Sequence, residues 1–459
     1  MSDALNKLSY GMAAAAGSRL AALLLSLVLN GILARVLPPT EFAFFGVLIS
    51  FLTIIVLVAQ GGYQTGIVKS VGEAVADARA GGKVGTSLTA ALIATIIGSL
   101  LMTAVAYALA GVILPPIDGQ QVAGATLALV LLMIPLMSIN VLLAEALRGA
   151  GLVGWASSLT ALGQHGGLVR AGILLILITA FSVFGQVGLR QLLFISVLSS
   201  ALAVALIIVF IHRNLHWSLD FRGGWLELSR TFPLNLRFLI AQFAQTLSGQ
   251  YAVTIISGMI FSGQLLAMFI AAQSLSVLLQ APHMLFAGAV PSLMIEAHRR
   301  SERHALEELL RYGSSLAFMM TLVIILPFIA LGPWIFSILF GQSYGDAYFY
   351  FLSIAPGLIG IAFGGTAARA LLLLGYERLY LRVAITVSII SPPFYFAIGS
   401  AFGPIGLGLA SSLVLAGQQL AVVVIAHRVL GVWSYARLDP AFYLRLLSKV
   451  STKVFGRNL

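Results

Sequence analysis

The sequence predicts an all-α integral membrane protein with about twelve transmembrane helices. Of its 459 residues, 60% are hydrophobic and only 9% are charged, whereas soluble domains carry roughly a quarter charged residues. The charged residues also leave long gaps, because no Asp, Glu, Lys or Arg occurs in 84–117, 119–144, 238–295 or 383–427. A spanning helix needs about 20 apolar residues, so each gap has room for at least one span.

The division into spans follows from where the charges and the turn residues fall. We place the spans near 10–35, 42–66, 85–114, 120–146, 152–178, 191–211, 234–261, 265–294, 312–339, 347–374, 380–401 and 405–427. Proline, glycine and small polar residues favour turns. They separate several spans, at Pro38-Pro39-Thr40, Pro115-Pro116-Ile117-Asp118, Ser262-Gly263-Gln264, Gly341-Gln342-Ser343-Tyr344-Gly345 and Gly403-Pro404.

Basic residues predict the orientation of the chain in the membrane. Nineteen of the 26 Lys and Arg residues fall at the termini and in alternate loops, whereas the opposite loops hold only Arg35 and Arg190. Positively charged loops stay in the cytoplasm. We therefore expect a multi-pass inner-membrane protein with both termini cytoplasmic. Membrane orientation also accounts for the net charge of +11, so we expect no nucleic-acid partner.

The longest loop, 212–233, divides six predicted spans from six others. We expect an N-terminal six-helix bundle over 1–213, a cytoplasmic linker over 214–233 and a C-terminal six-helix bundle over 234–430. The remaining residues, 431–459, mix aromatic and basic side chains. Such a segment favours the surface of an anionic leaflet, and a regulatory role is the alternative.

Arginines at membrane depth are the first candidate site residues. A charge at the centre of a bilayer costs about 2.5–3.5 kcal/mol on insertion scales, so it faces a wet cavity or a partner, or snorkels to an interface. Arg19 lies well inside the first span, and Ser26 and Asn30 share its helical face. For Arg170, Arg237 and Arg369, a cavity and an interface both remain open, whereas we expect Arg382 to snorkel.

Glutamines form the second group of candidates. Gln60 and Gln64 are four residues apart in the predicted second span, and Gln242 and Gln245 lie in the seventh. A single glutamine in a span more often joins two helices. The pair of spans within 238–295 holds six, at 242, 245, 250, 264, 273 and 280, which indicates a polar path.

The scarcity of acids restricts the substrate. Of 15 Asp and Glu residues, only Glu145 approaches membrane depth, and Arg148 can pair with it. A basic, polar interior favours an anionic, hydroxyl-rich substrate, and the planar guanidinium of Arg suits phosphate. No phosphate-binding Gly-Lys-Ser/Thr loop and no His-Glu-x-x-His motif occur. We therefore expect a protein that is not an enzyme and has no cofactor, and proton or sodium coupling remains open.

Four segments resemble a known family. They are 30–46, which contains Ala34-Arg35-Val36-Leu37-Pro38 and Glu41-Phe42, then 339–347, 374–378 and 403–412. In this order they resemble Wzx-type polysaccharide flippases of the multidrug/oligosaccharidyl-lipid/polysaccharide exporter superfamily. Two positions depart from the usual pattern, since Pro38 and Ala43 stand where glycines are usual.

The resemblance implies two six-helix bundles that form a V around a central cationic cavity. It also implies a bacterial inner-membrane flippase that moves an undecaprenyl-pyrophosphate-linked oligosaccharide to the outer leaflet by alternating access, for surface polysaccharide or O-antigen assembly. Its partners would then be this polyprenyl-linked glycan, membrane lipids and a polysaccharide polymerase complex. A secondary exporter of a small organic anion or drug, and a non-transporting scaffold for glycan synthesis, are the alternatives.

Overall fold

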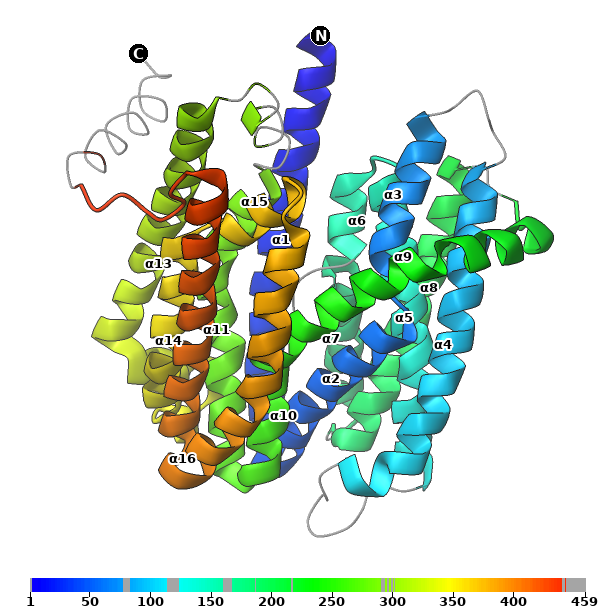
Figure 1. Ribbon diagram of the computed structural model, residues 1–459. Helices are drawn as coiled ribbons and strands as arrows, with labels where there is room; N and C mark the ends of the chain where they lie inside the picture. The colour runs from blue at the N-terminus through cyan, green and yellow to red at the C-terminus, as the bar shows by residue number, and fades with distance from the viewer. Residues whose placement is uncertain are drawn as a thin grey trace, which may run out of the picture. The chain divides into compact units, whose positions relative to one another are not determined.

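The computed structural model of the protein describes residues 2–76, 83–113, 124–159, 167–185, 187–215, 218–289, 294, 297–298, 300, 302–439 and 442. Within these residues the chain is almost entirely helical and no strand occurs (Figure 1). The predicted all-α class is therefore confirmed.

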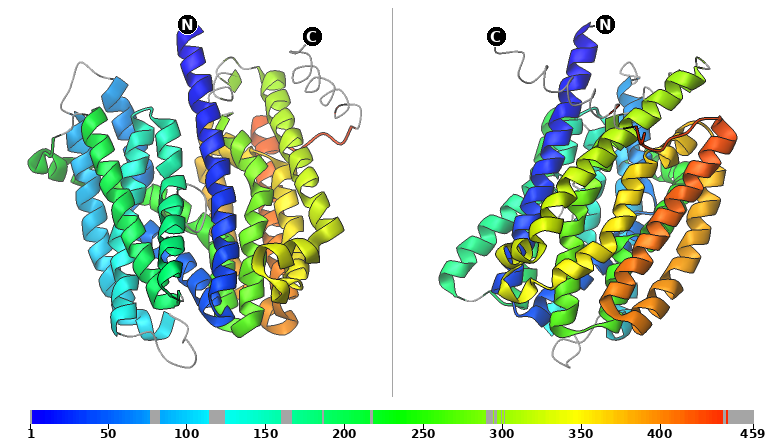
Figure 2. Two further views of the ribbon diagram at one scale, coloured as in Figure 1. Left: turned by 180° about the vertical axis from the view of Figure 1, so that it is seen from behind. Right: turned by 90° about the vertical axis from the view of Figure 1, so that its left-hand side faces the viewer.

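The helices of the described residues follow one another along the chain. They are α1 (Ser2–Val36), α2 (Pro39–Ala59), α3 (Tyr63–Ala76), α4 (Lys83–Ile113), α5 (Gly124–Gly149), α6 (Val153–Leu159), α7 (Leu168–Phe184), α8 (Leu189–Leu215), α9 (Phe221–Ser248), α10 (Gln250–Ile260), α11 (Gly263–Ala289), α13 (Arg303–Phe340), the 3₁₀ helix η1 (Gln342–Tyr344), α14 (Ala347–Gly364), α15 (Ala367–Leu373) and α16 (Glu377–Leu430). Figure 2 shows α1 from two sides as one long helix.

Nine helices in the described part of the chain are long and apolar enough to cross a membrane. They are α1, α2, α4, α5, α8, α11, α13, α14 and α16. The 54 residues of α16 are interrupted at Gly403, where φ is 69°, so this helix supplies two predicted spans. The fifth predicted span is divided between α6 and α7, and the seventh between α9 and α10.

Several predicted turns coincide with helix ends. The chain turns between α1 and α2 at Pro38, and between α10 and α11, where Gly263 adopts a positive φ of 57°. The predicted turn at 341–345 contains η1 and begins at Gly341, whose φ is 112°. The predicted turn at 115–118 lies outside the described residues.

The chain divides into two compact units. Unit 1 comprises Met1–Leu278, Phe328–Ala355 and Ala384–Val414. Unit 2 comprises Leu279–Pro327, Pro356–Val383 and Leu415–Leu459. The predicted division into bundles 1–213 and 234–430 stays a prediction.

Helix α5 is central to the packing of unit 1. It contacts α3, α4, α6 and α8, and α9 lies along α3 and α4. Large aliphatic side chains fill this region, among them Leu142, Leu147, Ile207 and Ile211, all fully buried. Burying such side chains contributes about 1.5–3 kcal/mol each relative to exposure, so α5 fixes the positions of the helices around it.

The expected cytoplasmic linker is mostly the beginning of α9. Asp220 caps this helix, since its carboxylate accepts a hydrogen bond of 2.9 Å from the Gly223 amide. The amide of Asp220 in turn donates to Thr89 Oγ1 of α4 at 3.2 Å. Residues 221–233 are therefore helical and anchored on α4, because an N-cap satisfies the free amides of a first turn.

In unit 2, the segment after α16 packs against its own helices. Ser434 is fully buried and donates to the Gly364 carbonyl at 3.0 Å, while the Arg437 amide donates to Ser315 Oγ at 2.8 Å. Trp433 stacks on His427 with ring centroids 3.6 Å apart. Part of the tail that we expected on the membrane surface therefore packs, over 432–437, on α13, α14 and α16. Residues 443–459 lie outside the described part.

Candidate functional site

Two glycines change the geometry that the sequence suggested for Gln60 and Gln64. Gly61 and Gly62 adopt positive φ values of 57° and 82°, which glycine reaches at no steric cost. Helix α2 therefore ends at Ala59 and α3 begins at Tyr63. The expectation that both glutamines lie four residues apart in a single span is wrong, because Gln60 caps the end of α2 and Gln64 lies in α3.

Gln60 is a packing residue in unit 1. Its side chain is fully buried, and Nε2 donates to the Ser138 carbonyl of α5 at 3.1 Å. Polar side chains often join helices in this way. The structure thus favours the helix-joining alternative for this glutamine.

Gln64 and Gln242 form a polar junction between α3 and α9. Gln64 Nε2 donates to Gln242 Oε1, and Gln242 Nε2 donates to Thr65 Oγ1. The residues of this junction are only half-buried. The structure therefore brings together two predicted site residues that lie 178 positions apart in sequence and adds Thr65, which the sequence analysis missed.

Small residues allow α3 and α9 to approach closely beside this junction. A Cβ atom at Gly62 would lie 1.9 Å from the Asn235 carbonyl oxygen, and one at Gly66 would lie 1.9 Å from Asn235 Oδ1. Both distances are far below van der Waals contact. The recurrence of glycine at 61, 62 and 66 is the sequence feature that could have located this crossing.

Arg19 belongs to a charged cluster with α5. The Arg148 Nη1 donates to both oxygens of Glu145 at 2.7 Å, as the i,i+3 spacing predicted. Arg19, half-buried on α1, is close enough for its charge to act on the same carboxylate. The cluster therefore holds two guanidinium groups and one carboxylate, which leaves a net positive charge.

Arg170 lies in a different environment. It is only 5% exposed, in the first turn of α7, and α7 packs against α1, α6 and α8. Within the described residues no carboxylate pairs with it, and its Nε has no hydrogen-bond partner. A buried charge without compensation is costly, so an anion beside this guanidinium would be stabilising. His165, nearby in sequence, lies outside the described residues.

The other candidates occupy separate places. In unit 1, Arg237 and Gln245 are exposed on α9, whereas Asn30 is buried and donates to the Ser26 carbonyl one turn earlier at 3.0 Å. In unit 2, Arg369 is exposed on α15, and its charge acts on half-buried His283. The described residues contain no group of ligands able to hold a metal ion.

Two segments with family resemblance meet in unit 1. Arg35 Nη2 donates to the Ile338 carbonyl at the end of α13, and Phe42 packs edge-on against Tyr344 with ring centroids 6.1 Å apart. Gln264 Nε2 donates to the Ser343 carbonyl at 2.9 Å. The α1–α2 turn and the 341–345 turn are thereby joined, a pairing that the sequence analysis did not foresee.

Tyr344 is the buried centre of this contact. Its side chain is 2% exposed, and its hydroxyl has no hydrogen-bond partner in the described part of the chain. Burial raises the pKa of Tyr344 to about 12, because the phenolate loses its hydration. The residue therefore acts as a neutral aromatic group at physiological pH.

The arrangement of helices is similar to that of several solved structures. The structure is similar to an inward-facing conformation of a multidrug resistance MATE family transporter of the MOP superfamily, with a TM-score of 0.71, 16% identity and coverage of 89% of this chain and 94% of that chain. It is also similar to the lipid II flippase MurJ in an inward closed conformation, with a TM-score of 0.67, 14% identity and coverage of 98% and 93%. The chain has the fold of these transporters.

An outward-facing structure of a MATE family transporter is similar as well, with a TM-score of 0.63, 17% identity and coverage of 93% of this chain and 95% of that chain. No protein-family model and no curated protein matches the sequence. The fold that these transporters share is therefore established from structure, while the resemblance to Wzx-type flippases stays a prediction.

Proposed function

We propose that this protein is a flippase that moves an undecaprenyl-pyrophosphate-linked oligosaccharide from the cytoplasmic to the outer leaflet by alternating access. The observation that carries the proposal is Arg170, a buried guanidinium that no described carboxylate compensates. A substrate that delivers a phosphate to membrane depth would supply the missing negative charge. The likeness to a lipid II flippase supports a lipid-linked substrate.

The arginine cluster on α1 and α5 suits the entry of such a substrate. A pyrophosphate near Arg19 competes with the carboxylate of Glu145, which Arg148 already binds through both oxygens. This competition keeps the affinity of the cluster for pyrophosphate moderate. A moderate affinity suits alternating access, because a substrate that binds two conformational states equally tightly does not shift the equilibrium between them. The half-buried amides of Gln64 and Gln242 supply donors and acceptors for sugar hydroxyls. Arg237, Arg369 and Gln245 remain candidates on exposed surfaces.

A leaflet assay tests this proposal. Purified protein is placed in liposomes that contain the lipid-linked oligosaccharide, and an impermeant reagent reports its exposure at the outer leaflet. We expect Arg170→Met to reduce flipping at least tenfold, and Arg19→Gln to reduce it as well. Arg213→Gln, which changes an exposed arginine at the end of α8, is the matched control and should leave flipping unchanged. Equal flipping by all variants would reject the assignment of the arginines.

Export of a small organic anion or drug is the second candidate, because multidrug transporters share the fold. Vesicle uptake of soluble anions discriminates the two functions. Uptake that requires Arg170, together with absent flipping, would favour the exporter. Flipping without uptake would favour the flippase.

We also propose that both termini lie in the cytoplasm of a bacterial inner membrane. The chain contains no cysteine, so single cysteines can be introduced without other changes. Gln191→Cys, at the beginning of α8, should react with an impermeant maleimide in intact cells, and Arg213→Cys, at its end, only after permeabilisation. The reverse pattern would contradict the orientation.

A further inference from the structure

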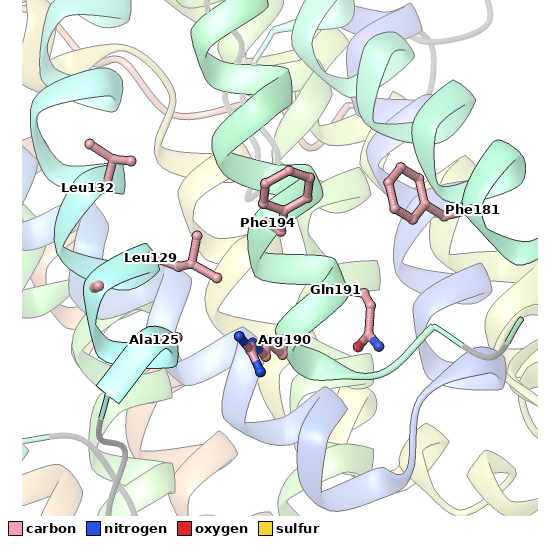
Figure 3. Close-up of a pocket in the computed structure, with 8 residues that line it drawn as sticks. Ala125, Leu129, Leu132, Phe181, Arg190, Gln191 and Phe194 are labelled. Carbon is pink, nitrogen blue, oxygen red and sulfur yellow. The ribbon is translucent and has the colours of Figure 1, made fainter. Parts of the chain in front are cut away.

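A groove in unit 1 lies between α5, α7 and α8, and none of the candidate substrate residues lines it (Figure 3). Its volume is about 560 Å³, within the 300–1,000 Å³ or so that is typical of small-molecule sites. Ala125, Ala128, Leu129 and Leu132 of α5 form one wall, and Phe181 of α7 and Phe194 of α8 form the other. Leu132 and Phe194 are each 48% exposed, so the groove opens to the surface.

The polar groups of this groove gather at one end. Figure 3 shows Arg190 and Gln191 at the beginning of α8, with Phe194, Phe181 and Leu132 farther along the groove. Arg190 and Phe194 are separated by about one helical turn, roughly 6 Å along the axis. The groove therefore has one guanidinium group at one end and an apolar lining along the rest of its length.

Arg190 is available for an external anion. It is exposed, and it forms no ion pair or hydrogen bond with any residue that the structure describes. The carboxylate of Glu41 instead accepts a hydrogen bond of 2.8 Å from the Leu189 amide. Since Glu41 occupies this first free amide of α8, the anion would bind the guanidinium rather than the helix end.

We propose that this groove binds a membrane phospholipid with an anionic headgroup, whose phosphate contacts Arg190 and whose acyl chain lies against Leu132, Phe181 and Phe194. A phospholipid combines one negative phosphate with a long apolar chain, which matches one guanidinium at the head of an apolar channel. Arg binds phosphate with charge-assisted hydrogen bonds, and Gln191 adds a neutral donor beside it. This site goes beyond the flippase proposal and does not depend on it.

Native mass spectrometry of the delipidated protein tests the proposal. The full chain is titrated with phosphatidylglycerol, with phosphatidylcholine and with undecaprenyl phosphate. We expect phosphatidylglycerol to bind the wild-type protein, and Arg190→Gln to weaken this binding about tenfold through loss of a charged hydrogen bond. Arg213→Gln, at the other end of α8, is the matched control and should bind as the wild type does.

A second variant probes the channel rather than the charge. Ala128→Phe fills the groove and should weaken phosphatidylglycerol binding to a similar degree. Ala205→Phe, which changes an exposed alanine of α8 outside the groove, should leave the binding unchanged. Thermal melting verifies that each variant is folded.

Three outcomes would overturn the proposal. One is equal phosphatidylglycerol binding by the wild type, Arg190→Gln and Ala128→Phe. Another is equal affinity for phosphatidylcholine and phosphatidylglycerol, which would leave the charge of Arg190 without a role. Tighter binding of undecaprenyl phosphate than of phosphatidylglycerol would assign the groove to a polyprenyl chain instead.

Discussion

Arg19 and Arg170 lie in the same unit and in neighbouring helices, yet their surroundings are opposite. The charge of Arg19 acts on Glu145, which also binds Arg148 through both oxygens. Arg170 is more deeply buried and has no carboxylate among the described residues. The first arrangement is explained by folding, since Glu145 supplies a carboxylate to the two arginines. The second costs stability, and a substrate that supplies the anion would explain why such a residue is present.

Among the substitutions that test this comparison, we expect Arg170→Met to have the largest effect. We expect flipping to fall at least tenfold while the melting temperature stays unchanged or rises. Replacing buried charges with apolar groups of similar volume is often neutral or stabilising. The leaflet assay and a thermal melt in detergent measure the two effects. A clear loss of stability would show that Arg170 is structural.

Glu145→Gln tests the compensated arrangement. The substitution leaves Arg148 and Arg19 without their acid, and breaking a buried pair costs about 3–5 kcal/mol. Because 26% of the Arg148 side chain and 15% of the Glu145 side chain are exposed, we expect a smaller loss, of roughly 2–3 kcal/mol. Denaturant unfolding measures it. Glu73→Gln, which removes an exposed acid on α3, is the control and should change stability little.

Gly66→Ala extends the comparison to the junction of α3 and α9. The added Cβ would press on Asn235 Oδ1, an oxygen without a hydrogen-bond partner in the described residues. Overpacking typically costs about 1–3 kcal/mol, and we expect a destabilisation in this range. Gly172→Ala, where a Cβ would meet open space, should be neutral or stabilising. Equal melting temperatures for the two variants would contradict the close crossing.

Two buried tyrosines give the smallest and most closely matched test. Tyr395 donates to the Ser248 carbonyl at 2.7 Å, whereas the Tyr344 hydroxyl has no partner in the described part of the chain. We expect Tyr395→Phe to cost about 1 kcal/mol and Tyr344→Phe to be neutral or stabilising, because an unsatisfied buried hydroxyl is unfavourable. Melting temperatures that shift in the same direction by the same amount would contradict this assignment.

The sequence predicted those parts of the fold that depend on hydropathy and on turns between spans. The turns at Gly263, Gly341 and Gly403 coincide with positive φ values. The breaks inside predicted spans were missed, because hydropathy runs on without a charge through Gly61-Gly62 and through Gly249. Glycine in a membrane span is compatible with both a continuous and a broken helix, so only the tertiary contacts determine whether the helix breaks there.

The candidate site was predicted by residue type rather than by pairing. Arg19 and Arg170 were singled out as arginines at membrane depth, and Glu145 was matched with Arg148 through their i,i+3 spacing. The contact between Gln64 and Gln242 spans 178 positions, and no local pattern encodes it. The sequence likewise left cavity and interface open for Arg170 and Arg237, and the structure places the first inside and the second on the surface.

The most direct test of the central claim changes the charge of the substrate rather than the protein. The same oligosaccharide is attached to undecaprenol through a pyrophosphate or through an uncharged ether, and both are assayed for flipping by the wild-type protein in liposomes. If basic residues hold an anionic head group, the pyrophosphate-linked glycan should be flipped and the ether-linked glycan should remain in its original leaflet. Equal flipping of the two would contradict the account.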